Sequence, residues 1–591
     1  MKASASQASP RRRLLTLLAV LSILALLVPM ATLGHHRPGH RGGPPAHPPG
    51  LLINIQLLAI NDYHGHLEPN TPGNVGGVPA GGAEYLATHL ELLRQGKKHS
   101  LTVAAGDLIG GTPFLSGLFH DEPSVESLNA MKLDVSSVGN HEFDHGVDEL
   151  LRHQHGGCHP VSGCFFPDEP YEGADFPWLA ANVTSASTGE TVLPPYWIKQ
   201  FENVKVGFIG MTLEGTPTLV AQSGIQGWNF ADEAETANAL VPELQAQGVE
   251  AIVVLLHEGG IPTSISDIDG CVGISGPIVE IHNNLDPAID VLITGHTHLP
   301  YNCVLTDPDG SPRRVTSAFA FGRVISEVNL VINRRTGEVR RDLVTATNHV
   351  VHQSVDPHPD LTAVLDKWRP LAQELGNQPV GQITADITRA GGPADDRSRE
   401  SDLGNMIADA QLWATTVNGA QIAFMNPGGM RADLLFASSP AGEGDGVVTY
   451  GEAFNVQPFG NLLTTIPMTG AQVVAVLEEQ CQPAGSSRPF LHLGVSVGFS
   501  YDLDRTITGG NCTSVSISNV QLNGTALDPS ATYRVTVNNF LVDGGDNFGT
   551  FAEVPVSQRV GAGIDLNALI AYLGEEGPIA PPGTDRVNEA F

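Results

Sequence analysis

Short apolar runs that alternate with amphipathic segments are the feature that most constrains how this chain folds. The apolar runs are rich in β-branched residues and include LLINIQLLAI (51–60), LTVAA (101–105), VKVGFIGM (204–211), EAIVVLL (250–256) and IDVLITG (289–295). Such near-continuous runs are typical of strands that are buried on both faces of a sheet. Between them lie helical patterns such as AEYLATHLELLRQG (83–96) and EAETANALVPELQAQG (233–248). The alternation predicts an α/β fold.

The length of the chain exceeds what one hydrophobic core supports. With 591 residues, two or three domains are expected. The charged segment HPDLTAVLDKWRPLAQEL (358–375) predicts a helix that links two domains, because a second α/β pattern follows it. We therefore place a first domain at 51–350, a linker helix at 351–378 and a second domain at 379–591.

The N-terminus has the pattern of an export signal. Three arginines at 11–13 precede an apolar run at 14–33, so residues 1–34 are predicted to be a signal peptide. The run is long enough to span a bilayer, which leaves an uncleaved membrane anchor as the alternative. The Pro-, Gly- and His-rich residues 35–50 cannot build a core and predict a flexible tether. The protein is thus expected to be secreted or extracytoplasmic, either periplasmic or associated with the cell surface.

The charge balance limits the class of partner. The chain carries 31 basic and 63 acidic residues, which gives a formal net charge of −32. Such a surface repels nucleic-acid polymers and anionic membranes, so neither is an expected partner apart from the possible N-terminal anchor. A small anion can still bind where metal ions or clustered arginines reverse the local field. No feature of the sequence indicates an obligate protein partner.

Six cysteines predict disulfides rather than a metal knuckle. An even number in an exported chain favours disulfide bonds, and none of the six forms a C-x-x-C pair. Sequence neighbours suggest the pairs Cys158–Cys164, Cys271–Cys303 and Cys481–Cys512. Six cysteines permit fifteen pairings, so the alternatives stay open.

Potential metal ligands follow several of the apolar runs directly. They are Asp62 and His64, Asp107, Asn140 with His141 and Asp144, His257, and His296 with His298. In α/β sheets, ligands bind beyond the carboxyl ends of the strands, so these side chains are expected to meet there. The mixture of carboxylate, amide and imidazole suits divalent Zn, Mn or Fe better than calcium.

One of these segments also matches a protease pattern. HEFDH (141–145) satisfies H-E-x-x-H, which in zinc proteases lies on one helix. Here Gly139 and Gly146 flank the motif, which is poor support for a helix through both histidines. The extended pattern needs glycine and histidine where the chain has Asp148 and Leu151. We therefore disfavour a protease.

Five motifs occur in this order along the chain: D-x-H, G-D, G-N-H-E, a strand-end His and G-H-x-H. They resemble those of the calcineurin-like metallophosphoesterases. The resemblance implies a four-layer β-sandwich flanked by helices, with two divalent metal ions. It implies that one metal is bound by Asp62, His64, Asp107 and His298, and the other by Asn140, His257 and His296, with Asp107 bridging both. It also implies that His141 is not a ligand but faces the phosphate, while Asp144 orients its ring.

The second half carries another set of motifs. These motifs are RSRESDLGN (397–405), FMNPGGMRADL (424–434), VQPFGN (456–461) and VNNFLVDGGDNFG (537–549). Together they resemble the C-terminal domain of the secreted 5'-nucleotidases, which is a separate α/β substrate-binding domain. The resemblance implies that Phe459 and Phe540 sandwich the nucleobase, with Asp546 near the nucleoside. Phosphate or ribose would be held by Arg397, Arg399, Asn426, Arg431 and the glycine turn Gly428–Gly429. In the family this turn reads N-G-G-G, whereas Pro427 stands at its second position here and removes a backbone N–H.

Together the motifs predict an exported two-metal phosphohydrolase. We expect a metal-bound water to attack the phosphorus of a 5'-nucleotide and release a nucleoside and orthophosphate. Alternatives on the same scaffold are a 2',3'-cyclic-nucleotide phosphodiesterase with 3'-nucleotidase activity, a nucleotide-sugar pyrophosphatase, or a thiosulfate-ester hydrolase. A non-catalytic nucleotide-binding surface protein is the alternative from another class.

Overall fold

The computed structural model describes residues 50–69, 73–220, 224–392 and 395–589. The predicted signal peptide (1–34) and all but the last residue of the predicted tether (35–50) lie outside these residues. Among the helices of the described part, none is both long enough and apolar enough to cross a bilayer.

Two six-stranded sheets form the centre of the first half of the chain. The first has the strand order β16 (Thr345–Val350), β15 (Val324–Asn333), β1 (Leu52–Ile60), β4 (Ser100–Ala105), β5 (Val135–Ser137) and β6 (Trp178–Leu179). The second has the order β13 (Tyr301–Thr306), β14 (Pro312–Ser317), β12 (Ile289–Thr294), β11 (Ala251–His257), β9 (Val204–Thr212) and β8 (Tyr196–Phe201).

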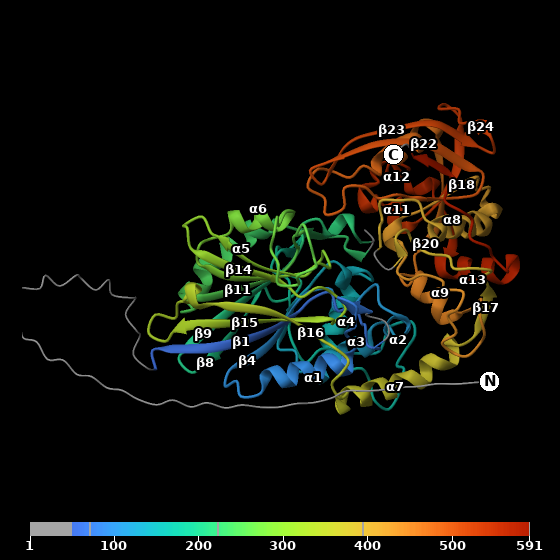
Figure 1. Ribbon diagram of the computed structural model, residues 1–591. Helices are drawn as coiled ribbons and strands as arrows, with labels where there is room; N and C mark the ends of the chain where they lie inside the picture. Colours follow the sequence, from blue (N-terminus) through green and yellow to red (C-terminus); the bar gives the residue numbers. More distant parts are fainter. Residues whose placement is uncertain (1–49, 70–72, 221–223, 393–394, 590–591) are drawn as a thin grey trace, which may run out of the picture. The chain divides into compact units, whose positions relative to one another are not determined.

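The two sheets face each other, and helices cover their outer faces (Figure 1). Because side chains alternate along a strand, Leu57 of β1 enters the core between the sheets while Leu58 packs under helices. The first sheet is covered by α1 (Ala83–Arg94), α3 (Glu122–Ala130) and α4 (Val147–His155), and the second by α5 (Glu233–Ala246) and α6 (Pro277–Asn284). The predicted four-layer sandwich is confirmed.

Strand direction brings the ends of separate strands to one edge. In the first sheet β1, β4 and β5 pair in parallel, and in the second β9, β11 and β12 do so. The apolar runs that predicted these strands match them closely, for example 51–60 for β1 and 289–295 for β12. The loops after these strands therefore carry the predicted ligands to a common edge.

The second half of the chain is a separate α/β unit, as predicted. Its main sheet has the order β21 (Gly494–Val495), β18 (Ile422–Met425), β25 (Thr532–Asn538), β20 (Leu462–Thr469) and β26 (Val560–Ile564). A four-stranded sheet of β24 (Thr525–Ala526), β23 (Asn511–Leu522), β22 (Phe499–Thr508) and β27 (Val587–Glu589) lies in the same unit. Helices α8 (Asp402–Thr415), α10 (Gly470–Glu479) and α13 (Asp565–Glu576) pack on these strands.

A helix and three disulfides complete the framework. Helix α7 occupies Pro359–Gly376 where the linker helix is predicted; Pro359 stands at its first turn, and the His358 side chain accepts a hydrogen bond from the Asp360 backbone. The cysteines pair with their sequence neighbours, as Cys158–Cys164, Cys271–Cys303 and Cys481–Cys512. The suggested pairing is thus confirmed.

Candidate active site

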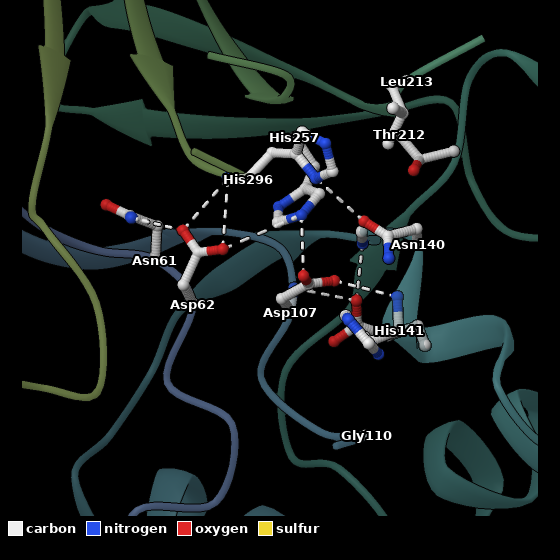
Figure 2. A network of polar contacts seen from close by, with 12 residues as sticks. Asn61, Asp62, Asp107, Gly110, Asn140, His141, Thr212, Leu213, His257 and His296 are labelled. Atoms are coloured by element: carbon white, nitrogen blue, oxygen red, sulfur yellow. Dashed lines mark hydrogen bonds and ion pairs between the residues drawn. The ribbon is translucent and has the colours of Figure 1, made fainter. Parts of the chain in front are cut away.

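The predicted metal ligands converge from five strand ends. The structure places Asp62 and His64 after β1, Asp107 after β4, Asn140 after β5, His257 at the end of β11, and His296 and His298 after β12. Figure 2 shows Asp62, Asp107, Asn140, His257 and His296 pointing toward one another from both sheets. Residues far apart in the sequence therefore share one small volume at the edge of the sandwich.

The converging side chains form two groups. In the first ligand group, one atom each of Asp62, His64, Asp107 and His298 lies within 4.8 Å of the others. In the second ligand group the same holds for Asp107, His257 and His296, and Nδ1 of His296 lies 3.1 Å from Oδ1 of Asn140. Asp107 belongs to both groups, as a bridging ligand has to.

The protonation of two histidines shows why the groups fit cations. Nδ1 of His64 lies 2.7 Å from the Gly110 carbonyl, and Nδ1 of His257 lies 2.7 Å from the Ala105 carbonyl. A carbonyl oxygen only accepts, so each Nδ1 carries a proton and each Nε2 faces the ligand groups; Nε2 of the neutral His64 presents a lone pair. Nε2 of His257 is buried without a hydrogen bond within the described residues, yet it lies 2.9 Å from Oδ2 of Asp107. Acceptors that converge in this way suit a divalent cation.

Burial keeps most of these imidazoles neutral, which is the form that binds metal. Desolvation lowers the pKa of His64 and His298 well below the ordinary value and lowers the pKa of His296 to about 3. His257 differs: burial lowers its pKa, but Asp107 and Asp62 outweigh burial and raise it to about 10. A divalent cation bound by His257 would take the place of the proton that these carboxylates attract.

Backbone strain is concentrated at the same residues. Five of the predicted ligands have a left-handed backbone, with φ of 48° at Asp62, 46° at His64, 51° at Asp107, 69° at His296 and 55° at His298. Left-handed non-glycine residues cost on the order of 1 kcal/mol each and cluster at functional sites. Glycine allows the close approach of the loops, since a Cβ on Gly139 would overlap Oδ1 of Asp107.

His141 lies beside the two ligand groups and belongs to neither of them. Its Nδ1 lies 2.7 Å from Oδ2 of Asp144, and its backbone N–H donates to Oδ1 of Asp107 at 2.9 Å. Burial lowers the pKa of His141, but the carboxylates of Asp144 and Asp107 raise it above its ordinary value. Asp144 therefore fixes the ring with Nε2 directed away from Asp144.

The structure contradicts the protease alternative. His141–Phe143 form one turn of 3-10 helix, and α4 begins only at Val147, so His141 and His145 do not share a helix. His145 is exposed, whereas His141 is partly buried. The H-E-x-x-H match is a coincidence of spacing.

Glu142 has a role that the sequence analysis did not assign. Its buried carboxylate accepts hydrogen bonds from the backbone N–H groups of Asp107 at 2.9 Å, Leu108 at 2.8 Å and Gly139 at 2.5 Å. These bonds tie the loop after β4 to the loop after β5. The only signal in the sequence is the Glu of G-N-H-E, and its target atoms are backbone atoms that a sequence pattern does not mark.

Asn61 is a second unassigned residue. Its Nδ2 donates to Oδ2 of Asp62 at 2.6 Å and to the Phe319 carbonyl at 2.8 Å, and its Oδ1 accepts from Ala318 N at 2.7 Å. Figure 2 shows the contact between Asn61 and the Asp62 carboxylate. Asn61 thus ties that carboxylate to the segment after β14.

Part of the predicted nucleotide pocket lies next to this centre. The ring of Phe459 stacks near His141, with centroids 5.9 Å apart and planes 18° apart. The guanidinium of Arg431 lies 5.7 Å from the Phe459 centroid. Burial lowers the pKa of Arg431 to about 10, so its side chain stays charged at neutral pH. An aromatic face and a cation from the second half of the chain therefore border His141.

The other pocket residues form a neighbouring group. Nδ2 of Asn426 donates to Oδ2 of Asp546 at 3.3 Å, and the turn Pro427–Gly429 follows directly. A Cβ on Gly428 would lie 3.2 Å from an Arg397 nitrogen. Phe540 packs directly on Gly545, beside Asp546, whereas Phe459 borders His141. The sandwich of a base between Phe459 and Phe540 stays a prediction.

The two candidate arginines before α8 differ in their surroundings. Nε of Arg397 donates to Oδ2 of Asp395 at 2.8 Å, whereas Nε of Arg399 donates to Oδ2 of Asp396 and its side chain is 52% exposed. Arg488, which the sequence analysis missed, donates from Nη1 to the Asp395 carbonyl at 3.4 Å. Burial raises the pKa of Asp395, but Arg397 and Arg488 outweigh it and hold that pKa well below its usual range. Arg488 lies in a loop far from the other motifs, so no local pattern indicates it.

Comparison with known proteins identifies both halves. Residues 55–300 match the family model of the calcineurin-like phosphoesterases, and residues 379–553 match that of the 5'-nucleotidase C-terminal domain. Cell wall protein Lmo0130 of Listeria monocytogenes is 32% identical over 89% of this chain and 67% of its own length. Endonuclease YhcR of Bacillus subtilis is 33% identical over 91% of this chain, but the match spans only 41% of that protein. The crystal structure of the 5'-nucleotidase precursor from Thermus thermophilus covers 91% of this chain and 99% of its own, with 25% identity and a TM-score of 0.71.

Proposed function

We propose that this protein hydrolyses 5'-nucleotides. It belongs to the family that joins a calcineurin-like phosphoesterase domain to a 5'-nucleotidase C-terminal domain, and it is a metal-dependent phosphoester hydrolase. The products are a nucleoside and orthophosphate. The observation that carries the proposal is the proximity of Phe459 and Arg431 to His141, at the edge where the two ligand groups meet. A phosphoryl site bordered by an aromatic face and a guanidinium suits a nucleotide better than a simple phosphate ester.

The chain's own residues divide the work of the reaction. Asp62, His64, Asp107 and His298 would hold one divalent cation, and Asp107, Asn140, His257 and His296 the other. Two such cations, when bound, supply the Lewis-acid charge that activates water and neutralises phosphoryl oxygens. Asp144 fixes the ring of His141, which leaves Nε2 to stabilise the phosphoryl group or to protonate the leaving oxygen.

The second domain supplies substrate binding in this proposal. Arg431 and Arg397 bind phosphate or ribose oxygens, and Asn426 with Asp546 binds the nucleoside. Stacking of the base on Phe459 or Phe540 adds about 1–3 kcal/mol without a strong preference for one base. A local cluster of arginines also explains how a protein with a formal charge of −32 captures an anion.

Release of inorganic phosphate from AMP is the direct test. We expect turnover by the full-length protein loaded with Mn or Zn, loss of turnover on chelation, and recovery when the metal is restored. If the metal-loaded protein releases no phosphate from any nucleotide, the proposal is wrong.

A second candidate function is cleavage of a phosphodiester. The specific observation in its favour is the 33% identity to a relative named as an endonuclease, although the matched part is 41% of that protein. The net charge of −32 disfavours a polymeric substrate, so a small diester is the better candidate. Comparing AMP with 2',3'-cyclic AMP and UDP-glucose separates the candidates: a higher kcat/KM for a diester than for AMP would replace the first proposal by the second.

We also propose that the protein works outside the cytoplasm. All six cysteines are paired, and disulfides persist in oxidising compartments. A relative named as a cell wall protein agrees with this location. Cell fractionation with thiol labelling tests it: the protein should be found outside the cytoplasmic membrane with no free thiol, and a reduced cytoplasmic pool would contradict the proposal.

A further inference from the structure

His298 is the least supported residue of the first ligand group. Asp62 is held by Asn61, His64 by the Gly110 carbonyl, and Asp107 by the His141 backbone. Nδ1 of His298 has no hydrogen-bond partner within the described part of the chain, and the side chain is 25% exposed. Metal-binding histidines ordinarily donate their second ring N–H to a fixed acceptor, which sets the orientation of the ring. Some other contact has to orient this one.

Phe321 makes that contact. Its ring meets the His298 ring edge to face, with centroids 5.1 Å apart and planes 81° apart, and meets His64 at 5.9 Å and 65°. Its backbone N–H donates to the Asp62 carbonyl at 2.6 Å. Both histidines of the first ligand group therefore touch one phenylalanine, which is itself tied to the loop that carries Asp62.

The backbone at Phe321 is strained. Its φ is 63°, and the next residue, Gly322, has a φ of 65°. A bulky residue in the left-handed region is a genuine outlier and costs on the order of 1–2 kcal/mol. Such strain persists only where surrounding structure enforces it, and it marks sites where the conformation has a use. Here the left-handed turn sends the aromatic ring toward His64 and His298.

Two further contacts hold the ring from other sides. The His66 ring stacks on Phe321, with centroids 4.0 Å apart and planes 28° apart. The Arg323 guanidinium lies 5.0 Å from the Phe321 centroid and 3.8 Å from the Phe319 centroid. A ring packed in this way has little freedom to rotate and can act as a fixed wall.

We propose that Phe321 is a positioning residue that orients His298, and packs against His64, for the cation of the first ligand group. Packing against Phe321 sets the orientation of the His298 ring, as the hydrogen bond to the Ala105 carbonyl sets that of the His257 ring. The second ligand group does not touch Phe321 through its rings, so the affinity of only one of the two cation sites should depend on Phe321. The inference rests on the proposed metal centre and not on any particular substrate.

The test is cation binding rather than turnover. Metal-free, full-length protein is titrated with Mn or Zn against a chromophoric chelator, which gives the number of sites and a Kd for each. We expect two sites in the unmodified protein. In Phe321→Leu the Kd of one site should rise on the order of 10–100-fold, as for loss of other groups that orient ligands, while the Kd of the other stays unchanged. Phe321→Tyr keeps the ring and should retain both sites.

A glycine variant separates positioning from general damage. Phe321→Gly removes the ring but also relieves the left-handed strain, because glycine adopts positive φ readily. We expect it to weaken the same site as Phe321→Leu, while the thermal midpoint of the metal-free protein falls less than it does in Phe321→Leu. If Phe321 had a purely structural role, the variant with the lower thermal midpoint would also have the weaker cation affinity.

Phe319→Leu is the matched control. Phe319 is also left-handed, with φ of 66°, and stacks on Arg323, but it packs in a small cluster with Ala318 and Val324. Both Kd values should stay unchanged in this variant. Equal weakening of both sites in Phe321→Leu, or two unaltered sites in Phe321→Leu and Phe321→Gly, would overturn the inference. Absence of any cation binding by the unmodified protein would instead refute the proposed metal centre.

Discussion

Substitution of Glu142 by glutamine should loosen the proposed metal centre although it replaces none of the predicted ligands. The carboxylate accepts three backbone N–H groups, from Asp107, Leu108 and Gly139, and the residue is 2% exposed. Glutamine keeps the shape but has one acceptor oxygen. That oxygen can keep the two hydrogen bonds that Oε2 of Glu142 accepts, from the Asp107 and Gly139 N–H groups. The NH2 group of the glutamine then faces the Leu108 N–H.

The magnitude follows from that geometry. One hydrogen bond to the Glu142 carboxyl group is lost and two N–H donors are opposed in a buried place, which costs about 2–3 kcal/mol. For a domain of this size we expect the thermal midpoint of the metal-free protein to fall by roughly 5 °C. Because Asp107 belongs to both ligand groups, both cation sites should weaken, in contrast to the single site that depends on Phe321.

Calorimetry and cation titration of Glu142→Gln measure both effects. Glu149→Gln is a suitable control, since Glu149 lies on α4 and pairs with Arg152, not with the strand-end loops. Unchanged cation affinities in Glu142→Gln would refute the role of Glu142 in holding the loop after β4.

Two further predictions concern the second domain. Arg397→Ala should raise the KM for AMP at least tenfold, whereas Arg399→Ala should leave the KM within about twofold of the unmodified value. The reason is that Arg397 lies beside Gly428, while the side chain of Arg399 is half exposed. Steady-state kinetics of both variants measures this, and equal effects on KM would contradict it. Burial raises the pKa of Asp565 to about 7, so the folded state keeps a proton that the unfolded state loses, and stability should fall as pH rises from about 4 to 7. Asp565→Asn should remove up to about 1.4 kcal/mol per pH unit of this slope, measured by denaturant unfolding across that range; an unaltered slope would show that Asp565 is ionised in the folded protein.

The convergence of the candidate ligands was predictable because its signal is local. Each is a polar residue directly after an apolar run, and parallel strands bring such ends together whatever the details of the loops. The disulfide pairs were predictable for the same reason, since each joins cysteines that are neighbours in the sequence.

The supporting residues were not predictable from the sequence. Glu142 binds backbone N–H groups, Phe321 acts through the direction that a left-handed turn gives its ring, and Arg488 meets Asp395 only after the second domain has folded. The positions of Phe459 and Phe540 likewise depend on two loops that are distant in the sequence. The sequence therefore did not indicate that Phe459 would lie near His141 while Phe540 packs on Gly545.

Phosphate release from AMP by His141→Ala, measured together with its metal content, tests the central claim most directly. His141 borders both ligand groups but is a member of neither, and its Nδ1 is bound to Asp144. The account predicts two cations per chain, as in the unmodified protein, with kcat lowered about 10²–10⁴-fold. Turnover of His141→Ala at the rate of the unmodified protein, with both cations bound, would contradict it.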